Sequence, residues 1–74
     1  MKIFIIEQNE NTGYDCYFAY IIAADFKPTV RRLAADHPGD EGKEVWQKAK
    51  ITKIGIYTGR KKRPHIILSD FRAG

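Results

Sequence analysis

The sequence predicts an α+β fold in the order β-β-α-β-β, with a four-stranded antiparallel sheet and one helix packed on one face. Three observations lead to this prediction. Two segments rich in β-branched and aromatic residues precede the one stretch with helical periodicity, and two more follow it. Clusters of Gly, Asn and Pro separate these segments. The 74 residues are expected to form one domain, 1–74, because a chain of this length cannot build a second core.

Residues 2–8 and 14–24 form the first predicted pair of strands. The first segment is rich in isoleucine around Phe4, a composition typical of a largely buried strand. Turn-forming residues at 9–13 reverse the chain, so the two segments are expected to pair as a hairpin. Side chains of the second strand alternate between faces. We expect the helix to cover the face with the smaller set, Tyr17, Ala19, Ile21 and Ala23.

Residues 26–36 carry the helical pattern, with apolar residues at helical spacing from Val30 onward. Asp25 is the predicted N-cap, and Pro28 is tolerated in a first turn. A His-Pro-Gly sequence then ends the helix, because proline disfavours helical geometry in the residue before it. We expect Arg31 to lie on the solvent side.

The second half of the chain predicts a helical turn and two more strands. A turn at 43–48 is expected to bring Trp46 down as a lid on the edge of the core. Residues 51–58 and 65–71 have strand-like apolar patterns. Sequential strands usually pair, so these two are expected to form a second antiparallel hairpin.

A run of four basic residues, Arg60, Lys61, Lys62 and Arg63, joins the last two predicted strands. Residues 43–63 carry eight Lys or Arg and one Glu, a net charge of +7, while residues 1–42 sum to −3 and the rest to zero, giving +4 overall. Basic surfaces bind phosphates with release of counterions, or acidic protein surfaces. The predicted contact residues for a nucleic acid or an acidic partner are Lys48, Lys50, Lys53, Arg60, Lys61, Lys62 and Arg63. Tyr57, expected on the strand face of Lys53, is a candidate ring for base stacking.

A second candidate surface is the other face of the 14–24 strand, where the predicted apolar contact residues are Tyr14, Phe18 and Tyr20. A three-turn helix cannot cover both faces of this strand. The cover could come from the 38–48 loop, from another protein, or from a second copy, so a homodimer is an open alternative.

Candidates for catalysis are few, and the sequence predicts no catalytic residue, metal or cofactor. Cys16 lies within a strand, where a free cysteine is usually a small apolar residue. An enzyme using Asp36, His37 and Asp40 is the weakest hypothesis, because their spacing matches no zinc or EF-hand motif.

The composition indicates where the protein works. Cys16 is the single cysteine, so no intrachain disulfide can form, and a reducing cytoplasm is expected. The longest uncharged stretch, 16–24, is far shorter than the roughly 20 apolar residues of a membrane helix, so no membrane contact is expected.

Short sequence elements along most of the chain are shared with a known group of proteins. They are Gly13-Tyr14-Asp15-Cys16-Tyr17, Ile22-Ala23-Ala24, His37-Pro38, Trp46, Ile54-Gly55 and the terminal Phe71-Arg72-Ala73-Gly74. In these elements the chain resembles a group of small, mostly uncharacterised bacteriophage and prophage proteins. The resemblance implies a protein that acts in the infected bacterial cytoplasm and binds host factors.

Small phage proteins without catalytic residues commonly block restriction or CRISPR complexes. This comparison is an analogy that rests on the phage setting. The leading interpretation is therefore a non-enzymatic inhibitor of a host defence system, which binds a host protein or nucleoprotein complex through its basic surface. A DNA mimic would be acidic, so the positive charge excludes that mechanism. The alternative is a small nucleic-acid-binding accessory module.

Overall fold

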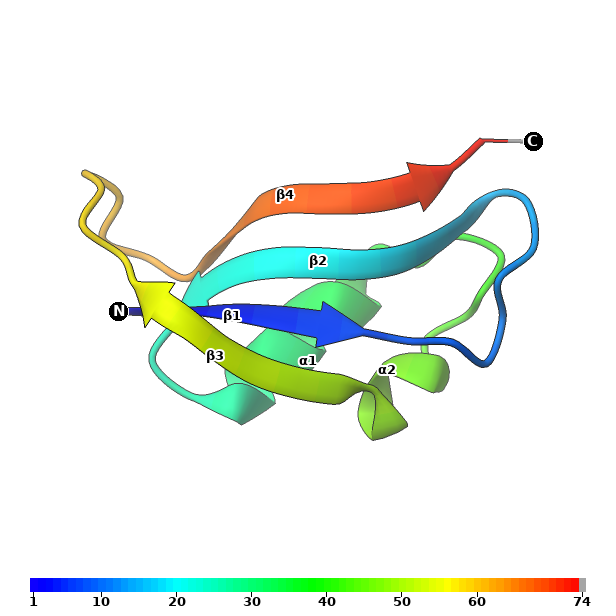
Figure 1. Cartoon of the computed structure of the whole chain (residues 1–74), viewed down its shortest axis with the longest axis horizontal. Helices are drawn as coiled ribbons and strands as arrows, with labels where there is room; N and C mark the ends of the chain where they lie inside the picture. Colours follow the sequence, from blue (N-terminus) through cyan, green and yellow to red (C-terminus); the bar gives the residue numbers. More distant parts are fainter. Residues whose placement is uncertain (74) are drawn as a thin grey trace.

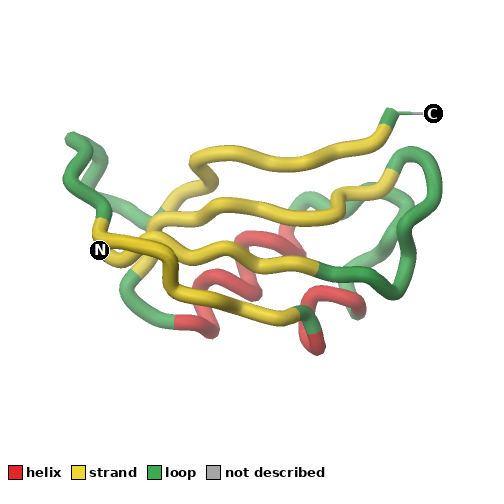
Figure 2. The backbone as a smooth tube through the Cα atoms, in the orientation of Figure 1, coloured by secondary structure: helices red, strands yellow, loops and turns green. Residues whose placement is uncertain are grey.

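The computed structural model describes residues 1–73. These form β1 (Lys2–Glu7), β2 (Cys16–Ala24), α1 (Lys27–Asp36), α2 (Val45–Lys48), β3 (Lys50–Ile56) and β4 (His65–Arg72) (Figure 1). All paired strands are antiparallel, and α1 lies behind the sheet in this view (Figure 2). Trp46 of α2 packs in the same core as Val30 of α1, so both helices contribute to one side of the sheet. The predicted α+β class and element order are confirmed, with α2 in the expected helical turn.

The strands lie in the order β3-β1-β2-β4, so β1 and β2 are central and β3 and β4 are the edges. The predicted hairpin of β1 and β2 is confirmed, with Ile5 opposite Ile21. The predicted second hairpin is wrong, because β3 pairs with β1 and β4 pairs with β2. The 57–64 connection therefore passes the ends of both central strands instead of making a tight turn (Figure 1).

The composition of the strands explains this order. β1 and β2 are largely apolar, and central strands bury the most surface. β3 and β4 carry charged side chains such as Lys53 and Asp70, which suit the edges of a sheet. The connection is long enough, because eight residues reach roughly 26 Å and the edges are about 14 Å apart.

The core lies on the face of β2 opposite to the one predicted to carry the helix. It is formed by the larger, even-numbered side chains, with Phe4 opposite Ile22 and Ile6 opposite Tyr20. α1 packs on this face through the buried Val30. This arrangement is favoured because burial stabilises in proportion to apolar area, and these side chains offer more of it than the alanine-containing face.

Trp46 closes the core, as predicted. Its side chain is fully buried, and its ring meets Tyr20 edge-on with 5.0 Å between centroids. The prediction that Arg31 faces solvent is wrong, because its guanidinium donates hydrogen bonds to the carbonyl oxygens of Trp46 and Ala49 at 2.9 and 2.8 Å. These bonds tie α1 to α2 and to the residue that follows α2.

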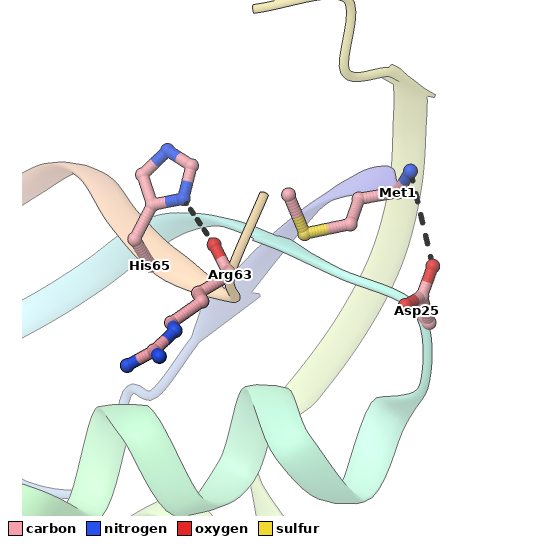
Figure 3. A network of polar contacts seen from close by, with 4 residues as sticks. All are labelled: Met1, Asp25, Arg63 and His65. Atoms are coloured by element: carbon pink, nitrogen blue, oxygen red, sulfur yellow. Dashed lines mark hydrogen bonds and ion pairs between the residues drawn. The ribbon is translucent and has the colours of Figure 1, made fainter. Parts of the chain in front are cut away.

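α1 begins one residue later than predicted, and its N-cap is Phe26 instead of Asp25. The Asp25 carboxylate instead pairs with the N-terminal amine of Met1 at 3.8 Å (Figure 3). Pro28 lies in the first turn, as expected. Neither helix within residues 1–73 is long and apolar enough to cross a membrane.

Because Tyr20 is buried, the protein is expected to lose stability at alkaline pH. Burial raises the pKa of its phenol above the ordinary value, with smaller contributions from Tyr17 and Glu41. Above pH 10 the unfolded state releases this proton while the folded state retains it, so the free energy of unfolding falls as pH rises. We expect the free energy of unfolding of the wild type, measured relative to that of Tyr20→Phe, to fall by up to about 1.4 kcal/mol for each pH unit above pH 10.

Urea unfolding followed by circular dichroism between pH 8 and 11 checks this expectation. Tyr14→Phe is the matched control, since it removes the same hydroxyl from an exposed position. Parallel curves for wild type and Tyr20→Phe would contradict the prediction.

Candidate functional site

The charged side chains are divided between the two ends of the sheet. One end holds the start of β1, the end of β2 and the 57–64 loop (Figure 1). We call it the basic end, and its basic residues are Lys2, Lys27, Lys53, Arg60, Lys61, Lys62 and Arg63. Of the nine acidic residues, all within the described chain, Asp25 lies here and the other eight lie toward the opposite end. The molecule is therefore polarised along the strands.

The basic run lies in residues 57–64, which we call the basic loop, and this loop is built on the ring of Tyr57. The Tyr57 N–H donates to the carbonyl oxygen of Met1 at 3.0 Å, which ties the start of the loop to the residue before β1. The Lys61 N–H donates to the Tyr57 hydroxyl at 3.2 Å. Gly59 lies so close to the same ring that a Cβ there would collide with it. The Tyr57 side chain thus contacts the loop at Gly59 and at Lys61.

His65 anchors the other end of the basic loop. Its Nδ1 lies 2.8 Å from the carbonyl oxygen of Arg63 (Figure 3). The rings of Tyr57 and His65 meet edge-on with 5.0 Å between centroids. Because Tyr57 follows β3 and His65 begins β4, this contact joins the two edges of the sheet above its central strands.

The structure separates Tyr57 from Lys53, contrary to the predicted shared face. A register shift in β3 at Ile54 leaves Lys53 opposite Phe4, on the helix side of the sheet. Tyr57 meets His65 instead, and its ring is occupied by contacts within the loop. The predicted shared face of Tyr57 and Lys53 is therefore wrong.

The seven predicted basic contact residues do not form one surface. The four residues of the basic loop lie together, and Lys53 lies near them beside Lys2 and Asp25. Lys50 begins β3 opposite Glu7, and Lys48 ends α2, so both lie at the far end. A strand of this length spans about 20 Å, which is roughly two Debye lengths at 0.1 M salt. The candidate site is reduced to the basic end.

The three predicted apolar contact residues do not share a surface either. Tyr20 is 3% exposed and belongs to the core, so its prediction as a contact residue is wrong. Tyr14 is 64% exposed, and its ring lies 4.6 Å from the guanidinium carbon of Arg72. Phe18 is half-buried beside Ala19.

The apolar surface that sequence reasoning missed is the sheet face away from the helices, which we call the open face. Paired residues of neighbouring strands share a face, so the register defines rows of side chains on it. From the far end to the basic end, the rows are Lys50-Glu7-Ala19-Asp70, Thr52-Ile5-Ile21-Leu68 and Gly55-Ile3-Ala23-His65. A signal was present in β1, where apolar residues occupy both sets of alternating positions.

A groove of about 430 Å³ lies at the far end, between β1, α2 and β3. Its lining includes the acidic side chains of Glu7, Glu10 and Asp70 together with the basic Lys48 and Lys50. Three acidic side chains against two basic ones leave the groove weakly acidic.

The candidates for catalysis are placed unfavourably for chemistry. Cys16 is buried, and burial raises the pKa of its thiol, with further increases from the negative charges of Glu41 and Asp40. A protonated thiol is a poor nucleophile. His37 is exposed. Across residues 1–73, no three His, Cys, Asp or Glu side chains gather to form a group that could hold a metal ion.

Comparison of the chain with protein-family models, with curated proteins and with solved structures gave no match. The resemblance to phage proteins stays a prediction, and the function is argued from the geometry of the basic end and the open face.

Proposed function

We propose that this protein is a non-enzymatic binding protein that inhibits a host factor, and that the basic end is its contact surface. The observation that carries the proposal is the basic loop, in which four consecutive Lys and Arg residues are exposed on a backbone held by Tyr57 and His65. A preformed loop loses less conformational entropy on binding than a mobile one. It therefore suits recognition of a partner surface.

The distribution of charge favours an acidic protein surface as the partner. Lys2, Lys27 and Lys53 add positive charge beside the basic loop, so the contact is concentrated at one end of the molecule. A long phosphate backbone that continued along the sheet would meet the acidic residues of the far end, Glu7 and Asp70. A compact acidic patch avoids this repulsion.

The resemblance to phage proteins suggests the setting. In this proposal the partner is a host protein or nucleoprotein complex of a restriction or CRISPR type, met in the cytoplasm of an infected bacterium. Binding would inhibit the complex by occupying an acidic surface that the complex needs for its activity. The positive charge of the basic end supports this mode over mimicry of DNA.

The test uses a variant with Arg60, Lys61, Lys62 and Arg63 all replaced by Ser. Wild-type protein is used for affinity capture from nuclease-treated host lysate, and the captured host protein is purified and titrated. We expect the loop variant to bind at least about 30-fold more weakly, as for the loss of a hot spot. Circular dichroism verifies that the variant is folded.

A matched control removes the same number of positive charges elsewhere, at the exposed Arg32, Lys43, Lys48 and Lys50. This control is expected to bind within about threefold of wild type, because screening weakens distant charges. Equal binding by the loop variant and wild type would contradict the proposal, as would the failure to capture any host protein.

A nucleic-acid-binding accessory module is the second proposed function, and the exposed basic run favours it because Lys and Arg can neutralise phosphates. It predicts binding to random oligonucleotides that weakens steeply between 50 and 200 mM salt. With four phosphate contacts, the slope of log K against log salt is expected to be about −3 to −4. No binding at 50 mM salt would contradict it.

A further inference from the structure

We propose that the open face is the interface of a symmetric homodimer, in which the sheets of two copies pack face to face with their strands antiparallel. The basic loop of each copy then lies against the acidic row of the other. The open face is a different surface from the basic end, which takes part in the dimer only through the charge contact of its loop. Apolar packing of the open face provides the main driving force.

The open face is apolar at its centre. The middle row carries Ile5, Ile21 and Leu68 on three adjacent strands, and Leu68 is 62% exposed. In the described chain both helices cover the other face, so these side chains have no helix above them (Figure 2). Ile5 and Ile21 are half-buried, so the row presents one exposed and two partly exposed apolar side chains. Apolar side chains gathered on one face are typical of an interaction site.

A second layer on this face would also complete a small core. A domain of this size supplies only about 3–5 kcal/mol from a single core, and self-association is one of the ways in which such domains gain stability. Sheets pack face to face at about 10 Å through interdigitated apolar side chains, and a second copy supplies such a face.

The area of the sheet fits a weak dimer. The strands have 6, 9, 7 and 8 residues. At about 3.3 Å along and 4.8 Å across a strand for each residue, the flat area is roughly 480 Å² per copy. Two copies together bury about 950 Å², close to the lower limit of about 1,000 Å² for a specific interface. We therefore expect a dimer that dissociates on dilution.

Charge selects the orientation of the two copies. The row at the far end of the open face carries Glu7 and Asp70 with Lys50 at its edge, and the basic loop borders the opposite end. A two-fold axis in the interface and perpendicular to the strands brings each basic loop to the partner's acidic row. An axis parallel to the strands would place the two basic loops together, where like charges repel.

Sedimentation equilibrium of the full chain tests the dimer. Between about 1 µM and 0.5 mM, an interface of this size should pass from dissociated to associated, and the mass should rise from 8.5 kDa toward twice that value. A mass that stays at 8.5 kDa throughout overturns the proposal, whichever other protein the open face binds.

Leu68→Arg tests which surface is used. The proposed axis brings the two Leu68 side chains near one another, so the variant opposes two guanidinium groups and should weaken dimerisation at least about 30-fold. Ile56→Arg is the matched control, because Ile56 is 67% exposed but lies opposite Lys2, on the helix side of the sheet. Equal weakening by both variants, or by neither, overturns the proposal.

Ile5→Arg distinguishes face-to-face packing from pairing along the exposed edge of β4. Ile5 lies on a central strand and in the same row as Leu68. Weakening by both substitutions supports the face-to-face dimer. Weakening by Leu68→Arg with no effect of a folded Ile5→Arg variant overturns it in favour of an edge contact.

Asp70→Lys tests the orientation and separates this inference from the proposed function. We expect a dimer about 3- to 10-fold weaker at 50 mM salt and nearly unchanged at 500 mM, because salt screens the charge contact. Glu44→Lys, at an exposed acid outside the strands, is the control. A stronger dimer for Asp70→Lys would overturn the antiparallel arrangement. Host-protein titration with Leu68→Arg tests partner binding independently, so either proposal can fail alone.

Discussion

Replacement of Trp46 by alanine is expected to leave most of the protein unfolded at room temperature. The side chain is fully buried, packs edge-on against Tyr20, and donates its Nε1–H to Oε2 of Glu41 at 2.9 Å. Removing a buried tryptophan typically costs about 3–5 kcal/mol. A domain of this size has only about that much stability from its core, so this one substitution removes most of it.

Urea unfolding followed by far-ultraviolet circular dichroism measures the effect. Trp46→Phe is the informative comparison, since it keeps an aromatic ring in the core but loses the hydrogen bond to Glu41. We expect it to remain folded and to lie between wild type and Trp46→Ala. A Trp46→Ala variant within about 1 kcal/mol of wild type would show that Trp46 does not close the core.

The second large effect is expected from Glu41→Ala. Glu41 is almost fully buried, and its two carboxylate oxygens accept hydrogen bonds from the backbone N–H of Tyr17 and from Trp46 Nε1–H, both at 2.9 Å. Its loss leaves one buried and one partly buried donor without acceptors, at about 1–3 kcal/mol each. We expect a destabilisation of about 2–5 kcal/mol, together with loosening of the 37–44 loop from β2.

Glu44→Ala is the matched control, because it removes the same charge from an exposed position three residues later. Its effect is expected to be below about 0.5 kcal/mol. Hydrogen exchange at the Tyr17 amide reports the contact directly, and it should accelerate in Glu41→Ala only. Equal stability of the two variants would show that the carboxylate has no structural role.

The helices and strands themselves could be predicted from local sequence patterns. The isoleucine-rich start, the proline in the first turn of α1 and the apolar segment around Ile66 each predicted an element within one or two residues of its observed bounds. Trp46 was also placed correctly, because a lone large apolar side chain in a polar segment gains most by covering the core. These features depend on neighbouring residues, which a sequence displays directly.

The sequence did not predict which side chains form hydrogen bonds with residues far away in the chain. Gln8 is buried, and its amide bonds the backbone of the 8–11 turn and the carbonyl oxygen of Tyr17. Glu41 and Arg31 bond atoms 24 and 15 residues away. A glutamate in a polar loop or an arginine on a helix ordinarily faces solvent, so local composition indicated exposure for both.

The candidate site was predicted in part. The four consecutive charges of the basic loop cannot be buried, so their exposure followed from the sequence alone. Their separation from Lys48 and Lys50, and the occupation of Tyr57 by the loop itself, depend on how β3 pairs. The open face was not predicted from the sequence. The register shifts between strands and the face that the helices cover together decide which side chains remain uncovered.

The sequence by itself therefore determined the α+β class, the single basic run and the approximate bounds of each element, because these depend on local propensity, periodicity and charge. Only the tertiary structure decided the strand order, the covered face of β2 and the neighbours of each charge. The physical reason is that several pairings satisfy the same hydrogen bonds and alternation. The one that buries the larger side chains beneath α1 and Trp46 is favoured, and it leaves the basic loop and the open face uncovered by the helices.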